Sequence, residues 1–281
     1  MMLLSIVLTD LAAMSERRID RLTNHDLSEL PPFLIDHAGL NSGFMIPQVA
    51  AASRLLVMED LLDYSGHVSA RIPGMDAYLI QPGVDPRSDV APERLLVVDF
   101  DGKVLEGLPG LRPPVETPIH GEIYRARPDV QSVLHSHMEL AIAFTLMEGV
   151  QLSLMRARAV RWESGVPTHP DPSHIKLKSQ GEALARDLGP HHAALMRAHG
   201  LVLVAESAPA LLVDAVHFDE NARAHMQVLQ AGKTPLPLSP AEIEQINKHE
   251  MRAFHVGKLW AYYVNKGRKA GVVPQDWPTG D

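Results

Sequence analysis

Residues 131–137 read QSVLHSH, an apolar run that ends in two histidines separated by one residue. The pattern predicts a strand over Val130–His137. Because strand side chains alternate between the two faces of a sheet, His135 and His137 project to the same side. Two imidazoles at this spacing can bind one metal ion, although an isolated pair also fits two polar residues at a strand end.

Two further residues along the chain strengthen the metal hypothesis. His199 precedes Gly200 at the expected end of another strand, where a side chain is exposed at the edge of a sheet. Glu116 lies in a proline-rich segment, and proline is tolerated only in the first turn of a helix, which places Glu116 at or near a helix N-terminus. Each alone also fits a structural role. Together, three histidines and a carboxylate suit Zn, Mn, Fe or Co, and not Ca or Mg, which prefer oxygen ligands.

The composition limits how a metal ion could be held. The chain has 281 residues, with 15 histidines and no cysteine. The lack of cysteine excludes disulfides, thiolate zinc sites, iron–sulfur clusters and a cysteine nucleophile. A metal ion must therefore be bound by His, Asp or Glu.

The charge and hydropathy patterns bear on partners and location. There are 26 Lys and Arg against 34 Asp and Glu, a net charge of −8, which disfavours nucleic acid as a partner. No apolar run approaches the roughly 18 residues needed to span a bilayer. The apolar start Met1–Thr9 lacks the basic segment and the cleavage site of a secretory signal. We therefore expect a cytoplasmic protein without a membrane partner.

Strand patterns dominate the middle of the chain and helical patterns flank them, which favours a layered α/β sandwich. Residues 1–46 are expected to form an N-terminal helical arm and loop, and residues 47–281 one domain with a C-terminal helical extension. Asp101-Gly102 predicts a hairpin. The main expected helices cover 47–63, 116–127, 140–147, 181–188 and 209–230, with another long one from the capping box at Ser239, and the main expected strands cover 67–72, 77–81, 95–99, 130–137, 193–199 and 201–205.

The order of several motifs resembles the class II aldolase/adducin family. These motifs are GHVSAR (66–71), YLIQPG (78–83), LLVVDFDGKVLEG (95–107), VETPIHGEIYRARPDVQSVLHSH (115–137) and RAHGLVLV (197–204). The resemblance covers about residues 47–230. It implies a three-layer α/β/α sandwich with a largely antiparallel central sheet, and a homotetramer with active sites between neighbouring subunits. It also implies one divalent metal ion per subunit, bound by His135, His137 and His199, with Glu116 as catalytic acid/base and possible fourth ligand.

The sequence departs from the sugar-phosphate members of this family at the phosphate site. Pro114 and Val115 stand where those members carry small hydroxylated residues, and residues 81–84, QPGV, replace a hydroxyl-bearing turn. Phosphate binding needs several donors or cations, and these side chains supply none. His67 stands where those members usually have Asn. We expect His67 and Gly83 to contact the substrate, although a loop histidine that caps a turn is the alternative for His67.

The remaining pattern resembles the decarboxylase branch of the family, which acts on hydroxylated aromatic or pyridine carboxylates. It implies a lyase that decarboxylates a dihydroxyphthalate-like or hydroxypyridine-dicarboxylate-like substrate through an enolate or phenolate stabilised by the metal ion. Glu116 would protonate the ring carbon. The alternatives are an aldolase for a non-phosphorylated hydroxy acid or sugar, and an adducin-like interaction module. The connection 160–180 offers further candidates for a second carboxylate: His169, His174, Lys176 and Lys178.

Overall fold

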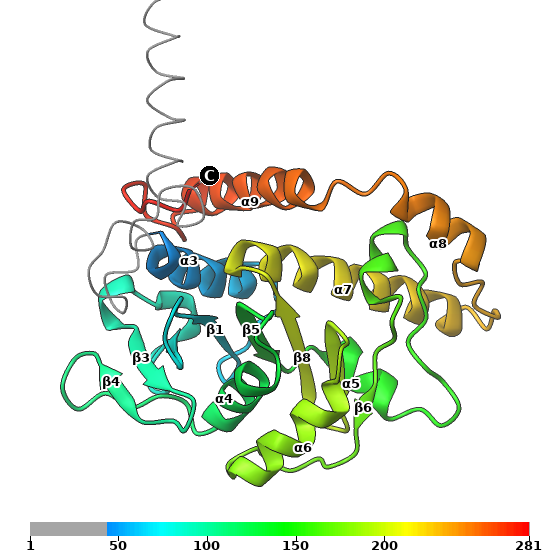
Figure 1. The fold of residues 1–281 in the computed structure, drawn as a ribbon. Coiled ribbons are helices and arrows are strands. Elements are labelled where there is room, and N and C mark those ends of the chain that lie inside the picture. Colours follow the sequence, from blue (N-terminus) through cyan, green and yellow to red (C-terminus); the bar gives the residue numbers. More distant parts are fainter. Residues whose placement is uncertain (1–43, 281) are drawn as a thin grey trace, which may run out of the picture.

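The computed structural model describes residues 44–280 and contains, within them, one mixed sheet of eight strands (Figure 1). The strands are β1 (His67–Arg71), β2 (Ala77–Ile80), β3 (Leu96–Asp99), β4 (Val104–Glu106), β5 (Ser132–Ser136), β6 (Thr168–His169), β7 (Ala193–Met196) and β8 (Gly200–Ala205). Their order is β4-β3-β2-β1-β5-β8-β7-β6. All neighbours are antiparallel except β6 and β7. The predicted N-terminal arm lies outside the described residues up to residue 43, and the domain boundary after residue 46 stays a prediction.

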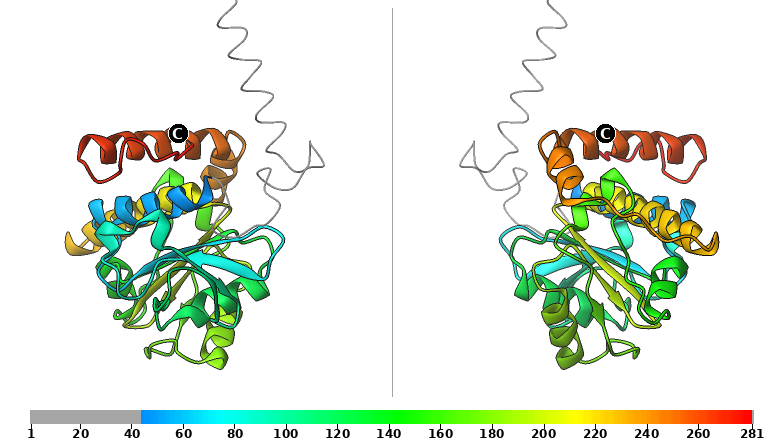
Figure 2. Two further views of the ribbon diagram at one scale, coloured as in Figure 1. Left: turned by 90° about the vertical axis from the view of Figure 1, so that its left-hand side faces the viewer. Right: turned by 90° about the vertical axis from the view of Figure 1, so that its right-hand side faces the viewer.

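Helices cover both faces of the sheet, which confirms the expected α/β/α sandwich (Figures 1 and 2). They are α3 (Met45–Met58), α4 (Thr117–Ala126), α5 (Glu139–Thr145), α6 (Lys178–Leu188), α7 (Ala208–Gln230), α8 (Pro240–Asn247) and α9 (Arg252–Lys269). On one face lie α3 and α7, and on the other lie α4 and α6. The C-terminal α9 packs on the outer side of α3 and α7 as a further layer.

Alternating side chains divide the interior into two apolar cores. Val68, Leu134 and Leu203 point toward α3 and α7. Their strand neighbours Val133 and Val202 point toward α4 and α6. A sheet that is apolar on both faces needs helices on both faces, and this requirement explains the layered architecture.

Several predicted elements end earlier than expected, among them the helix over 47–63, which ends at Met58. The capping box at Ser239 is confirmed, because its hydroxyl accepts from the Glu242 N–H and the Glu242 carboxylate accepts from the Ser239 N–H. The predicted long helix is nevertheless two helices, since α8 buries no side chain whereas α9 buries Trp260. The strand predicted over 193–199 stops at Met196, and residues 197–199 form a turn in which Ala198 has a φ of +53°.

The hairpin predicted at Asp101-Gly102 joins β3 and β4, and Gly102 has a φ of +87° that favours glycine. Among the helices of residues 44–280, none has the length and apolar character needed to cross a membrane. The cytoplasmic location expected from the sequence stays a prediction.

Candidate metal centre

The structure brings Glu116, His135, His137 and His199 together, with one potential ligand atom from each lying within 4.8 Å of the others. His135 is in β5 and His137 follows it, whereas His199 lies in the turn between β7 and β8. Because β5 and β8 are hydrogen-bonded neighbours, this turn lies beside the end of β5. Gly200 makes the approach possible, since a Cβ there would lie 2.4 Å from the Ser136 carbonyl oxygen.

Hydrogen bonds orient two of the three imidazoles. The Nδ1–H of His135 donates to the Leu201 carbonyl oxygen at 3.1 Å, which leaves the lone pair on Nε2. The Nδ1–H of His137 donates to Asp63 Oδ2 at 3.0 Å, with the same consequence. Burial and the neighbouring histidines hold the pKa of His135 well below its usual value. Metal ligation requires this neutral form of the ring.

Unpartnered buried nitrogens make the cluster fit a metal ion. His135 Nε2 and both ring nitrogens of His199 are buried and have no hydrogen-bond partner in the described part of the chain. Leaving such atoms unpaired is costly, and coordination of a divalent ion would satisfy one lone pair on each ring. Imidazole nitrogens with one carboxylate are the donor set of borderline divalent ions such as zinc.

Glu116 is the N-cap residue of α4, as predicted, but its side chain does not cap the helix. Instead, Oε1 accepts a hydrogen bond of 2.9 Å from the Ile175 N–H. Oε2 lies 3.6 Å from His135 Nε2, and Oε1 lies 3.6 Å from His199 Nε2. The carboxylate is therefore held at the centre of the cluster by a backbone donor from the loop before α6.

That loop explains which of the 160–180 candidates reach the centre. His174 Nδ1 lies 3.5 Å from Glu116 Oε1, and its side chain is largely exposed. His169 instead binds Asp187 at 2.6 Å. Lys178 binds Asp101 at 3.2 Å, and nothing in the structure places Lys176 at the centre.

Asp63 is a residue that the sequence reasoning missed. Its Oδ1 accepts from the N–H groups of Ser65 and Gly66 at 3.0 and 2.7 Å, while Oδ2 accepts from His137. Burial raises the pKa of Asp63, but the Gly66 and His137 donors outweigh that effect and lower it overall. The Asp-x-x-Gly turn at 63–66 was the available signal, although no local pattern points to His137.

His67, the first predicted substrate contact, opens β1 opposite His135 and is only 1% exposed. It is thus a buried strand residue and not a loop histidine. The centroids of its ring and the His135 ring lie 5.1 Å apart, and its Nδ1 lies 2.6 Å from His120 Nε2. This places His67 beside the metal-ligand cluster.

Gly83, the second predicted contact, lies against the segment that leads to Glu116. Its N–H donates to the Arg112 carbonyl at 2.9 Å, and a Cβ at Gly83 would lie 3.3 Å from Pro114 Cα. The two segments that lack phosphate-binding side chains are therefore neighbours in space. The exposed side chains that they present, Val84 and Val115, offer no hydrogen-bond donor.

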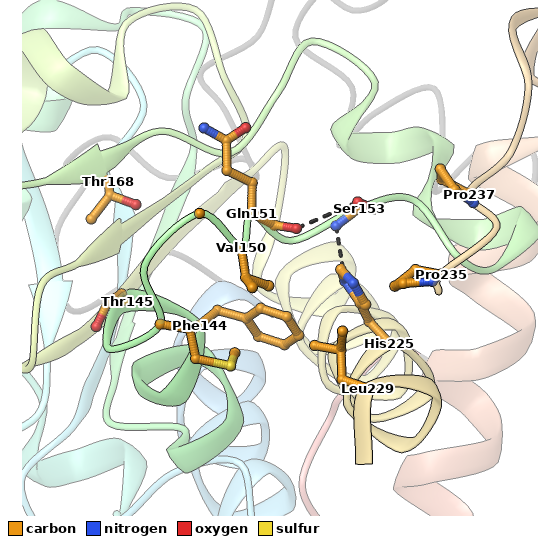
Figure 3. A pocket seen from close by; sticks show the side chains of 12 residues that line it. Phe144, Thr145, Val150, Gln151, Ser153, Thr168, His225, Leu229, Pro235 and Pro237 are labelled. Carbon is orange, nitrogen blue, oxygen red and sulfur yellow. Dashed lines mark hydrogen bonds between the residues drawn. The ribbon is translucent and has the colours of Figure 1, made fainter. Parts of the chain in front are cut away.

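Two cavities differ in their relation to the cluster. A cavity of about 640 Å³ between α5, α7 and the segment after α7 is lined by Phe144, His225 and Leu229, among others, and by none of the four candidate ligands (Figure 3). A cleft of about 840 Å³ is lined by His137 and Asp63 together with residues of α7. It offers one approach to the cluster.

Comparison with known proteins gives a family match over most of the chain. Residues 47–226 match the class II aldolase and adducin N-terminal domain. A 3,4-dihydroxyphthalate decarboxylase from Rhodococcus jostii is 30% identical over 230 residues, which cover 77% of this chain and 90% of that enzyme. An aldolase II superfamily protein from Pseudomonas syringae has a TM-score of 0.70 at 24% identity, covering 83% of this chain and 95% of that one. It shares the fold.

The N-terminal residues match a different family. Residues 1–61 match the aromatic amino acid lyases, and a probable histidine ammonia-lyase from Thermoplasma volcanium is 62% identical over 50 residues. Those residues cover 18% of this chain but only 10% of that enzyme. In the described part of this match, α3 packs beside α7 on one face of the sheet and contributes to its apolar core.

Proposed function

Because this chain belongs to the class II aldolase and adducin family and is a metal-dependent carbon–carbon lyase, we propose that it decarboxylates a hydroxylated aromatic dicarboxylate of the 3,4-dihydroxyphthalate type. The observation that carries this proposal is a cluster of potential metal ligands whose Glu116 is preceded by a segment without phosphate-binding side chains. Pro114 lies against Gly83, Val115 follows it immediately before Glu116, and none of these side chains can bind a phosphate group.

The residues that would hold the divalent ion are His135, His137 and His199, with Glu116 as a fourth ligand or as a nearby acid. Bound there, the ion supplies a Lewis acid for the negative charge that is released when the carbon–carbon bond breaks. The backbone carbonyl of Leu201 and the carboxylate of Asp63 hold two of the imidazoles with Nε2 directed to the cluster.

Glu116 is the residue that moves the proton in this proposal. Its carboxyl group gives a proton to the ring carbon that bears the leaving carboxylate, ortho to a hydroxyl group. The bond to the carboxylate then breaks, CO2 leaves, and the electron pair returns to the ring. Water reprotonates Glu116, while the Ile175 N–H keeps Oε1 in place through the cycle.

The test is to incubate metal-loaded protein with 3,4-dihydroxyphthalate and to measure CO2 and 3,4-dihydroxybenzoate. Hydroxybenzoates and pyridine dicarboxylates form the rest of the panel. Release of an aldehyde from a non-phosphorylated hydroxy acid would favour the aldolase alternative. Turnover that depends on a sugar phosphate would refute the interpretation of Pro114 and Val115, and indifference to Mn²⁺ or Zn²⁺ would exclude both enzymatic readings.

Two variants test the roles of the cluster residues. His137→Ala is expected to abolish metal binding, because it removes a ligand. Glu116→Gln is expected to retain most metal binding and to lose turnover, because the amide cannot deliver the proton. Near-normal turnover of Glu116→Gln would remove the acid/base assignment.

A homotetramer with sites between subunits belongs to the same proposal. Apolar side chains are exposed on segments that adjoin Glu116: Val115 precedes it, Val84 follows Gly83, and Leu177 lies two residues after Ile175. Such side chains are commonly covered in an assembly. Sedimentation velocity measures the oligomeric state directly, and a fully active monomer would refute an active site formed between subunits.

A further inference from the structure

Four buried polar side chains form a continuous hydrogen-bonded chain between β1 and α4. His67 Nδ1 lies 2.6 Å from His120 Nε2, and His120 Nδ1 lies 2.6 Å from Ser69 Oγ. Ser69 Oγ lies 2.7 Å from Tyr124 Oη. None of the four residues is more than 1% exposed. The proposed reaction uses His120, Ser69 and Tyr124 in no step.

The number of protons on each group sets the direction of these bonds. Among the described residues, the only hydrogen-bond acceptor within reach of the Tyr124 hydroxyl is Ser69 Oγ, because the Val133 backbone can only donate to the phenol, so a satisfied phenol must donate to Ser69. The single Ser69 proton is then left to donate to His120 Nδ1. Burial lowers the pKa of His120 to about 3, so its ring is neutral and carries its proton on Nε2. That N–H donates to His67 Nδ1.

The reverse direction leaves a buried donor unpaired. If His67 Nδ1–H donated to His120, Ser69 would donate to Tyr124, and the phenolic proton would have no acceptor. The proposed direction leaves one donor unpaired, His67 Nε2–H, whereas the reverse leaves the Tyr124 O–H unpaired and also leaves His67 Nε2 without a donor, so the hydrogen bonds favour the proposed direction.

The series of hydrogen bonds from Tyr124 ends at Nε2 of His67. Because Nδ1 accepts from His120, a neutral His67 carries its proton on Nε2, which has no hydrogen-bond partner among residues 44–280. The ring lies between those of His120 and His135, with centroid distances of 4.7 and 5.1 Å. We propose that Tyr124, Ser69 and His120 are positioning residues that hold His67 with an Nε2–H donor toward an anionic oxygen of the substrate.

A positive charge nearby supports an anionic ligand. The Arg87 guanidinium is 4% exposed and donates to the carbonyl oxygens of Gly66, Pro82 and Asp85, with no ion pair in the described part of the chain. Burial, followed by the neighbouring His120 and His135, holds the pKa of His67 well below its usual value, and the Arg87 charge adds a smaller effect of the same sign. A neutral N–H donor close to a buried guanidinium suits a carboxylate or phenolate oxygen, although the carboxylates of Asp63 and Asp85 offset part of the Arg87 charge. Only this choice of ligand rests on the proposed function, because the tautomer follows from the hydrogen bonds.

Nitrogen spectra test the tautomer directly. Protein labelled with ¹⁵N-histidine and loaded with diamagnetic Zn²⁺ is compared with its His67→Gln variant, and the signals lost identify His67. The expected result is a protonated Nε2 and an unprotonated Nδ1. A protonated Nδ1 beside an unprotonated Nε2 would overturn the proposal.

A matched pair of variants tests the donor. The amide nitrogen of glutamine reaches about as far as Nε2, whereas that of asparagine reaches about as far as Nδ1. His67→Asn should therefore raise KM for 3,4-dihydroxyphthalate by roughly 10-fold to 100-fold, and His67→Gln by no more than about threefold. Equal effects of the two variants at equal zinc content would refute the donor role.

The positioning role of His120 has its own rescue test. His120→Leu removes the bond to His67 Nδ1 and should raise KM more than it lowers kcat, whereas the amide N–H of His120→Gln should restore most of the affinity. A loss that is equal in both variants, or confined to kcat, would contradict positioning. If the wild type releases no CO2 from 3,4-dihydroxyphthalate, the proposed function fails, and the nitrogen spectra still decide the tautomer.

Discussion

Asp63→Asn is the substitution with the sharpest expected effect on metal binding. The Asp63 carboxylate accepts two backbone N–H groups on Oδ1 and the His137 ring on Oδ2. If the asparagine oxygen keeps the two backbone bonds, its NH2 group faces His137 Nδ1. That nitrogen must then accept, the ring proton moves to Nε2, and the atom that faces the cluster loses its free lone pair.

The expected loss of zinc affinity is about 10-fold to 100-fold, or roughly 1.4 to 2.7 kcal/mol. The opposite amide orientation would spare His137 but would break the bonds from Ser65 and Gly66, each worth about 1 kcal/mol of folding stability. Competition with a chromophoric chelator measures the affinity, and thermal unfolding of the apo protein measures the stability.

Asp89→Asn is the matched control for this charge change. The Asp89 side chain is 78% exposed, pairs with Arg54 and makes no hydrogen bond or ion pair with a candidate ligand in the described part of the chain. Its substitution should leave zinc affinity unchanged and alter stability by less than about 1 kcal/mol. If Asp63→Asn binds zinc as tightly as the wild type and is equally stable, Asp63 has no role in orienting His137.

Three further outcomes follow from the same structure. Gly121→Ala should destabilise the fold by about 1 to 3 kcal/mol, because the new Cβ would lie 2.1 Å from the Phe100 carbonyl oxygen. Gly257→Ala, which has open space around it in α9, should stabilise the fold by about 0.5 to 1 kcal/mol. Urea unfolding measures both changes, and a change of the same sign in the two variants would contradict this packing. Burial lowers the pKa of His120 to about 3, so as the pH falls below 6.5 the unfolded state takes up a proton that the folded state does not. The free energy of unfolding should therefore fall by about 2 kcal/mol between pH values well above 6.5 and pH 5. His120→Gln should reduce this decrease, and an unchanged pH dependence in that variant would contradict the assignment. Zinc at 100 times its Kd should raise the unfolding free energy by about 2.7 kcal/mol, and chelation should reverse this; a similar gain in His137→Ala would place the ion elsewhere.

Local pattern was sufficient for the features that depend on neighbouring residues. The alternation in QSVLHSH put His135 and His137 on one face, and the prolines around Glu116 placed it at the start of α4. The Asp101-Gly102 hairpin and the Ser239 capping box were equally local. The break between α8 and α9 could not be predicted from local pattern, because it depends on which of the two helices packs against the core.

The order of the motifs determined the family and the fold class, but it could not assign partners to the functional side chains. His137 meets Asp63 across 74 residues, Glu116 meets the Ile175 N–H across 59, and His67 meets His120 across 53. These pairs exist because the order of strands in the sheet and the position of α4 on one of its faces bring distant segments within hydrogen-bonding distance. The sequence thus predicted which residues form the candidate centre, and only the tertiary structure decided which proton each of them holds.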